Sequence, residues 1–209
     1  MALSMRTVSL GFVAFLSMHV LLSYATPTHY DLVKRCHEGC LSKTVQEKIT
    51  DLQAYISPMF DQINSAEEVK SESTRPVVAE IVEAIDSTTA NVQAYIESKF
   101  PLNVVLGVNF YGSTEASTKA LVDVLSDLVH TAVEEVKVSL KLASDGEYNP
   151  CVEIFASICL GLAALLRVCC NLVTGLNVSL AALDQIKAFV QMCDQLGVGD
   201  SVSFLRNSS

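Results

Sequence analysis

Apolar residues spaced three and four positions apart constrain the fold of this chain more than any other feature. The first stripe consists of Leu41, Val45, Ile49, Leu52, Ile56, Met59 and Ile63. Such a stripe lies along one face of an α-helix, because the helix completes a turn in about 3.6 residues. Pro58 lies inside the stripe and predicts a kink or a split in this helix.

A second stripe predicts a helix that starts at Thr74-Arg75-Pro76 and ends at Phe100, before Pro101. Its apolar positions are Val78, Ile81, Ile85, Val92, Tyr95 and Ile96. Residues 52–56 (LQAYI) recur as residues 92–96 (VQAYI), which indicates either a duplicated helical unit or convergence of two similar helices. The β-prone stretch Leu102 to Gly112 has no strand partner, so we expect a buried loop there.

The third predicted helix starts at Ser113 or Thr114 and fails before Ser144-Asp145-Gly146. Its expected core positions are Leu121, Leu125, Leu128, Ala132 and Val136, widened by Val122, Val129 and Val133. A last helix is expected from Asn177 or Ser179 to the glycines at 197 and 199. Its inward positions would be Leu180, Leu183, Ile186, Phe189, Val190 and Cys193.

Residues 151–173 form a segment that is apolar on all sides. Only Glu153 and Arg167 are charged, and the thirteen residues Ile154 to Leu166 carry no charge. A membrane span needs about 20 apolar residues, and Arg167 interrupts any longer span, so a buried central helix is favoured over a membrane helix. The pattern predicts an all-α fold, an up-and-down bundle of about five amphipathic helices around a very apolar central helix.

The N-terminus resembles a secretory leader. One early cation, Arg6, precedes an apolar run that ends in Ser23-Tyr24-Ala25, which predicts a signal peptide over residues 1–25 with cleavage after Ala25. Residues 26–35 then form a short pro-segment ending in Lys34-Arg35 with a second cleavage after Arg35, unless this pair is an ordinary surface pair. We expect a single helical domain over 36–200, a flexible tail over 201–209 and an extracellular, secreted protein that can associate with a cell wall.

Seven cysteines follow the leader and predict disulfides in an oxidising compartment. They are Cys36, Cys40, Cys151, Cys159, Cys169, Cys170 and Cys193. Their distribution favours bridges that staple the mature N-terminus to the C-terminal helices, with one thiol left over. The spacing lacks paired Cys-x2-Cys units, so no metal site is expected. The sequons at Asn177 and Asn207 are candidate N-glycosylation sites.

Charge and motifs exclude several functions. The net charge is −9, and loss of residues 1–35 would make it −11, because three cations and one anion leave with them. Such a chain is repelled by nucleic acid and by anionic membranes. No nucleophile elbow, metalloprotease motif or phosphate loop occurs, and His130 fits the rim of a helix. We expect a non-enzymatic protein without a cofactor.

The leader, the dibasic pair and the Ser, Thr, Ala and Val-rich helix from Ser117 to Val138 resemble small secreted fungal proteins of the hydrophobic-surface-binding type. The resemblance covers the style of residues 41–142, and the cysteine-rich last third departs from it. It implies a helical, extracellular protein that adsorbs to hydrophobic surfaces.

The sequence therefore predicts a secreted protein that binds hydrophobic surfaces or lipid-like ligands. Two alternatives stay open. One is a membrane protein anchored by residues 151–173, and the other is a secreted effector or structural protein that acts on a protein partner.

Overall fold

The computed structural model describes residues 44–97 and 114–206. The chain divides into two compact units, residues 1–41 and 42–209, and every described residue belongs to the second. Within the described ranges no residue belongs to a strand, so the predicted all-α class is confirmed there. The expected leader with Ala25 and Arg35, the cysteines Cys36 and Cys40, the loop 102–112 and Asn207 lie outside the described residues.

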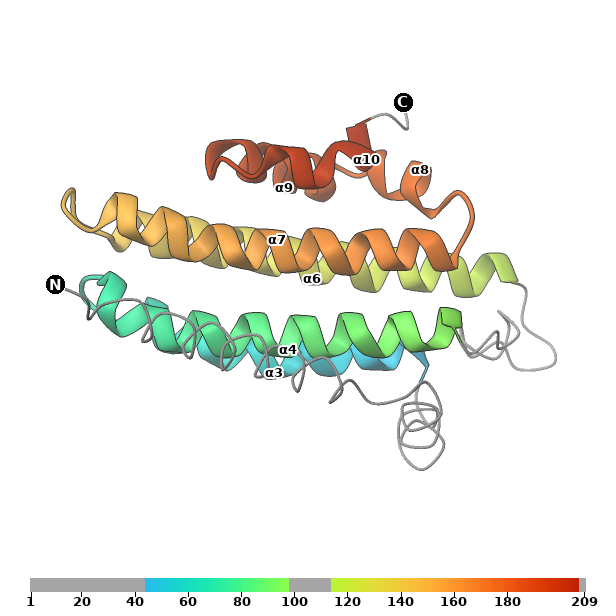
Figure 1. Cartoon of the computed structure of the whole chain (residues 1–209), viewed down its shortest axis with the longest axis horizontal. Coiled ribbons are helices and arrows are strands. Elements are labelled where there is room, and N and C mark those ends of the chain that lie inside the picture. The colour runs from blue at the N-terminus through green and yellow to red at the C-terminus, as the bar shows by residue number, and fades with distance from the viewer. Residues whose placement is uncertain (1–43, 98–113, 207–209) are drawn as a thin grey trace, which may run out of the picture. The chain divides into compact units, whose positions relative to one another are not determined.

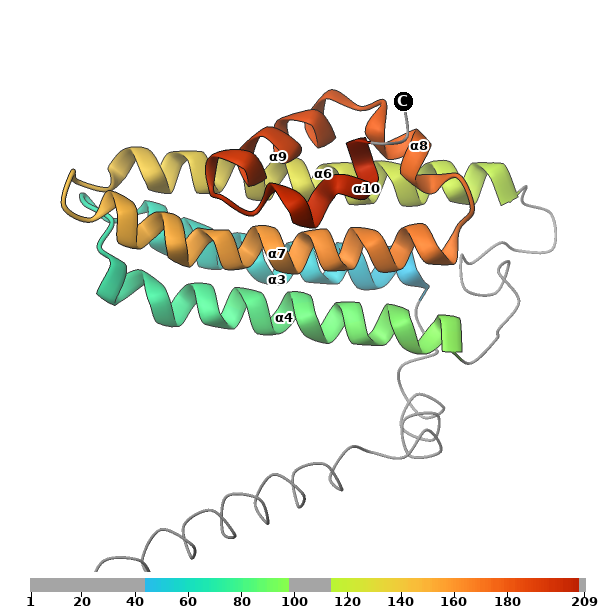
Figure 2. The ribbon, with the colours of Figure 1, turned by 45° about the horizontal axis from the view of Figure 1, so that its top comes forward.

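Four long helices make up most of this unit. They are α3 (Val45–Asn64), α4 (Ser71–Glu97), α6 (Thr114–Leu142) and α7 (Tyr148–Leu172). A C-terminal cap follows, consisting of α8 (Leu176–Ala181), α9 (Asp184–Gln195), the 3-10 helix η2 (Gly199–Val202) and α10 (Ser203–Arg206). Figures 1 and 2 show α3 and α4 as one layer, α6 and α7 as the next, and the cap over α6 and α7.

The long helices form two hairpins whose short loops lie at the same end (Figure 1). Around the bundle, α3 contacts α4 and α6, and α7 contacts α4 and α6. Chain direction alternates along the sequence, as in the predicted up-and-down bundle. The neighbours α3 and α6 nevertheless run parallel, as do α4 and α7, because the second hairpin stacks on the first in the same orientation. The simple order of antiparallel neighbours is therefore replaced by two stacked hairpins.

Backbone and side-chain bonds join the two hairpin loops. The Val69 N–H donates to the Leu142 carbonyl at 3.1 Å, and the Ser71 N–H donates to Glu147 Oε2 at 2.7 Å. Hydrogen bonds from Ser71 hold the pKa of the Glu147 carboxyl below its usual range. Glu147 thus caps the first turn of α4 from the other hairpin.

The interior is almost entirely apolar. Every long helix contributes fully buried side chains, among them Ile49, Ile85, Leu125 and Phe155. The buried polar side chains of the described residues are Thr74, Ser126 and Ser139. The predicted stripe of the third helix, including its widening positions, is buried as expected. Burial of this kind contributes about 25 cal/mol per Å² and is the main stabilising term.

A small polar cluster at the loop end joins α3 to α6. The Ser139 hydroxyl donates to Asn64 Oδ1 at 2.6 Å, and Asn64 Nδ2 donates to Glu135 Oε2 at 2.6 Å. Gln53 adds a bond to the Thr131 hydroxyl at 3.2 Å, nearer the middle of the same pair. We call Asn64, Ser139 and Glu135 the polar latch.

The apolar helix α7 has neighbours on three sides. It packs on α4, on α6 and on α8 and η2 of the cap, and twelve of its 25 residues are buried. By length and hydropathy it is the helix of the described residues that could cross a membrane, yet 61% of the relevant window is buried. Arg167 points to the cap, where it donates to the Ser201 carbonyl at 3.0 Å and lies 5.1 Å from the centre of the Phe204 ring.

The structure decides two expectations about helix boundaries. Of the two outcomes expected at Pro58, a kink or a split, the split is wrong, because α3 continues through this residue. Pro58 lies on the exposed face, where water can hydrogen-bond the carbonyl group that has lost its N–H donor. The start of α4 is Ser71 and not Thr74, which is buried within the helix. One local signal for a helix start was overlooked in the sequence. Thr44 and Glu47 form a capping box at the start of α3.

The C-terminal part also differs from the prediction. The expected last helix is two helices, broken at Ala182 and Leu183, and nothing local explains the break because neither residue is glycine or proline. The described part of the expected flexible tail, residues 201–206, belongs to η2 and α10. Its side chains Val202 and Leu205 are buried. Gly197 adopts a positive φ of 76° and ends α9 as expected.

The close approach of α4 and α7 predicts the effect of a mutation. A Cβ on Gly161 would lie 3.2 Å from Ile85 Cγ2, which is tighter than ordinary contact. We expect Gly161→Leu to lower the free energy of unfolding by about 1–3 kcal/mol through overpacking. Ala164→Leu, on the exposed face of the same helix, should change it by about 0.5 kcal/mol or less. Equal losses in urea unfolding would contradict this packing.

The Glu147 cap predicts a pH-dependent contribution to stability. Because its pKa is lowered on folding, the contribution is present above the ordinary value of 4.5 and is lost as pH falls through the lowered pKa. At neutral pH, Glu147→Gln should unfold at a lower temperature than the wild type, and this difference should close in acid. Asp145→Asn, an exposed change in the same loop, should show no such closing difference.

Candidate functional site

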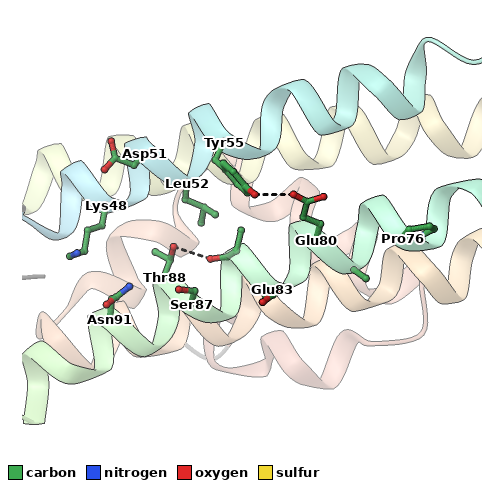
Figure 3. A pocket seen from close by; sticks show the side chains of 12 residues that line it. Lys48, Asp51, Leu52, Tyr55, Pro76, Glu80, Glu83, Ser87, Thr88 and Asn91 are labelled. Carbon is green, nitrogen blue, oxygen red and sulfur yellow. Dashed lines mark hydrogen bonds between the residues drawn. The ribbon is translucent and has the colours of Figure 1, made fainter. Parts of the chain in front are cut away.

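An open groove of about 860 Å³ runs between α3 and α4 (Figure 3). Eight of its twelve lining residues carry a polar or charged group, and the other four are a leucine, a proline and two alanines. The lining consists of Lys48, Asp51, Leu52, Tyr55, Pro76, Ala79, Glu80, Glu83, Ala84, Ser87, Thr88 and Asn91. The stripe of α3 explains the position of the groove, since Leu52 belongs to the core and Tyr55 lies on the flank of that stripe.

Tyr55 bridges the groove. Its hydroxyl, on α3, donates to Glu80 Oε1 on α4 at 2.9 Å, and half of its surface is exposed (Figure 3). The hydrogen bond to Glu80 and the charge of that carboxylate raise the pKa of the phenol, and Glu83 adds a smaller effect. Tyr55 therefore stays protonated and remains a hydrogen-bond donor at neutral pH.

The charge of the groove is acidic. Asp51, Glu80 and Glu83 outnumber the single cation Lys48. Such a lining favours cationic or hydrogen-bonding groups in water. The Thr88 hydroxyl donates to the Ala84 carbonyl of its own helix at 3.0 Å.

The five described cysteines carry free thiols. Cys151, Cys159, Cys169 and Cys170 lie along α7, and Cys193 lies on α9. All are buried except Cys170, which is partly exposed. The predicted disulfide staple is therefore not seen among them, and its N-terminal members lie outside the described residues.

Burial contributes to a raised pKa at Cys159, Cys169 and Cys170. Burial and the neighbouring Cys170 raise the pKa of Cys169, and burial raises the pKa of Cys170 to about 11. The pKa of Cys159 is raised by a hydrogen bond with Cys193 and by burial. A raised pKa leaves little thiolate at neutral pH, and the thiolate is the reactive form.

Other candidate residues lie apart from the groove. Asn177 is partly exposed and sits inside the short helix α8, not in an open turn between helices. His130 is exposed on α6, at the rim where it was expected. Within residues 44–97 and 114–206, no three His, Cys, Asp or Glu side chains gather in a way that could hold a metal ion.

The repeated pentapeptide did not identify the groove. Tyr55 in the first copy is 50% exposed, while Tyr95 in the second is 5% exposed, so the two copies turn different faces inward. The sequence also gave no sign of Glu80. Its hydrogen bond with Tyr55, 25 positions away, depends on how α3 packs against α4.

Comparison of the sequence with known protein families, curated proteins and solved structures finds no match.

The Tyr55–Glu80 bond predicts a shift in titration. Glu80→Gln should lower the pKa of Tyr55 toward its ordinary value of 10.0, because the acceptor charge is lost. Glu83→Gln should lower it less, since Glu83 acts only through space. Tyrosine ring NMR signals followed against pH would measure both, and equal shifts would contradict the geometry.

Proposed function

We propose that this protein is a secreted, non-enzymatic helical protein that binds hydrophobic surfaces or lipid-like ligands. The observation that carries the proposal is the apolar interior, built from three long amphipathic helices and the very apolar α7, with three buried polar side chains among the described residues. The leader-like N-terminus supports secretion.

The interior, and not the groove, is the apolar surface that such binding would use. The α3–α4 groove is lined mainly by polar and acidic side chains, which suit a lipid chain poorly. Amphipathic helices can instead place their apolar faces on an interface, with their polar faces toward water. Binding by this route requires the two hairpins to separate.

The specific bonds that join α3 to α6, and so oppose that separation, include the polar latch and the bond from Gln53 to Thr131. Apolar side chains make up the core of the interface, and an oil or lipid surface can replace their contacts at little cost because the burial term is not directional. The hairpin loops stay joined through Val69 and Glu147 at one end.

The net charge of −9 should make binding depend on the charge of the surface. Anionic vesicles repel such a chain, while neutral vesicles and uncharged hydrophobic beads do not. We therefore expect binding to phosphatidylcholine vesicles to exceed binding to vesicles rich in phosphatidylserine, most clearly at low salt. Recovery of all the protein in the soluble fraction with beads and neutral vesicles would contradict the proposal.

The polar latch predicts the direction of a mutational effect. Ser139→Ala removes a fully buried hydroxyl and the partner of Asn64, at a cost of about 1–2 kcal/mol. It should favour the open form by about tenfold and increase the bound fraction in vesicle flotation. Ser57→Ala is the matched control, because that hydroxyl bonds only to the Gln53 carbonyl of its own helix. Reduced binding by Ser139→Ala would argue against opening.

A membrane anchor is the second candidate, supported by the length and hydropathy of α7. Its buried faces and the bonds of Arg167 to the cap weigh against this function. Carbonate extraction separates the two, since a surface-bound protein is released and an integral protein stays in the pellet.

A further inference from the structure

The corner of the cap around α8 is exposed, yet its chain segment carries no charge. The sixteen residues 168–183 contain no Asp, Glu, Lys or Arg, although charged residues make up 18% of the whole chain. Within this segment Thr174, Gly175, Val178 and Ser179 are exposed. Val178 is 53% exposed, the largest fraction among the large hydrophobic side chains of the described residues. This water-facing segment therefore has no charged group of its own to hydrate it.

The same segment holds an acceptor sequence for N-linked glycans. Asn177-Val178-Ser179 matches the Asn-x-Ser pattern, and its middle residue is not proline. Asn177 is partly exposed, and both residues that follow it are exposed. The buried side chains that anchor α8 are Leu176 and Leu180, and Figures 1 and 2 show α8 at one end of the cap. A glycan on Asn177 would therefore extend into water without displacing a buried side chain.

We infer that Asn177 carries an N-linked oligosaccharide, which supplies the polar surface that the uncharged segment lacks. The inference rests on the proposed secretion, because this modification belongs to proteins of the secretory pathway. It also explains the exposure of Val178, since the first sugar of the glycan is attached to the neighbouring residue and shields this side chain from water.

The donor is an oligosaccharide linked through pyrophosphate to a polyprenyl lipid of the secretory membrane. Nδ2 of Asn177 attacks C1 of the first N-acetylglucosamine, and the new C–N bond replaces the C–O bond to the pyrophosphate. The polyprenyl pyrophosphate leaves with the bonding electron pair, and a base of the transferring enzyme takes up the proton that Nδ2 loses. No atom is oxidised or reduced in this step.

The transfer has to precede the folding of α8. In the folded protein the Ser179 hydroxyl donates to the Gly175 carbonyl at 3.5 Å, and the acceptor sequence is wound into a helix. The six residues of α8 are too few for a stable helix in water, because nucleation costs more than so few hydrogen bonds return. Contacts with α6, α7, α9 and α10 hold it, and the last two follow it in the chain. The acceptor sequence is therefore unwound and accessible until the C-terminal residues pack.

Peptide mapping of the full chain secreted from eukaryotic cells tests the inference. Trypsin separates the two sequons, because Asn177 lies in the peptide 168–187 and Asn207 in the peptide 207–209. We expect the peptide 168–187 to carry a glycan. Treatment with peptide N-glycosidase should release it and leave an aspartate at the acceptor position. Secreted protein in which this peptide is entirely unmodified overturns the inference.

Matched variants separate the acceptor sequence from the side chain, in a chain that also carries Asn207→Gln. Asn177→Gln and Ser179→Ala should each abolish the glycosidase-sensitive shift in gel mobility. Ser179→Thr should keep the shift, because threonine also completes the acceptor sequence. Asn171→Gln is the control and should keep it too, since Asn171 is exposed in the same segment but lies outside any sequon. A shift that persists in Asn177→Gln contradicts the inference. Because transfer precedes folding, cell extracts report the glycan even for a variant that folds poorly.

A foreign leader distinguishes failure of this inference from failure of the proposed secretion. A natural chain that stays in the cytosol contradicts secretion. The same chain placed behind the leader of a known secreted protein still enters the secretory pathway and is exposed to the transferring enzyme. A glycan on the peptide 168–187 of that product supports the site, and its absence overturns the inference whatever the natural leader does.

Discussion

The burial of apolar helix faces against one another is the constraint on which this structure depends. It is most demanding where α4 meets α7, because a Cβ on Gly161 would lie 3.2 Å from Ile85 Cγ2, closer than ordinary contact. The same pair of helices, α4 and α7, runs parallel where the second hairpin packs on the first. The loop bonds of Val69 and Glu147 then follow, since they join two loops that this stacking brings to the same end.

The cap covers apolar surface of α7 that the other long helices leave uncovered. A helix this apolar is buried against other helices or lies in a membrane. Here α4, α6 and the cap cover most of its apolar surface, although Leu160 stays 47% exposed. Arg167 connects α7 to the cap by a hydrogen bond and by contact with Phe204. The charge that argues against a membrane span is thus also a structural link to the C-terminus.

Polar interactions in this protein act at the ends and edges of an apolar core. The polar latch joins α3 to α6 near the loops, and the Tyr55–Glu80 bond lies in the open groove. Neither supplies much stability compared with apolar burial, but each selects one arrangement of the helices. The proposed function rests on this balance, because it requires internal apolar contacts to be exchanged for an apolar surface.

The sequence by itself determined the helical class, the core stripe of the third helix and its end before Ser144, because these follow from side-chain spacing within one helix. Only the tertiary structure decided which helices are neighbours and that residues 201–206 are packed. It also set the start of α4, since the cap at Ser71 comes from Glu147, 76 positions away. The Tyr55–Glu80 pair was equally hidden. Periodicity reports which face of a helix is apolar, but it carries no information about the partner that covers that face.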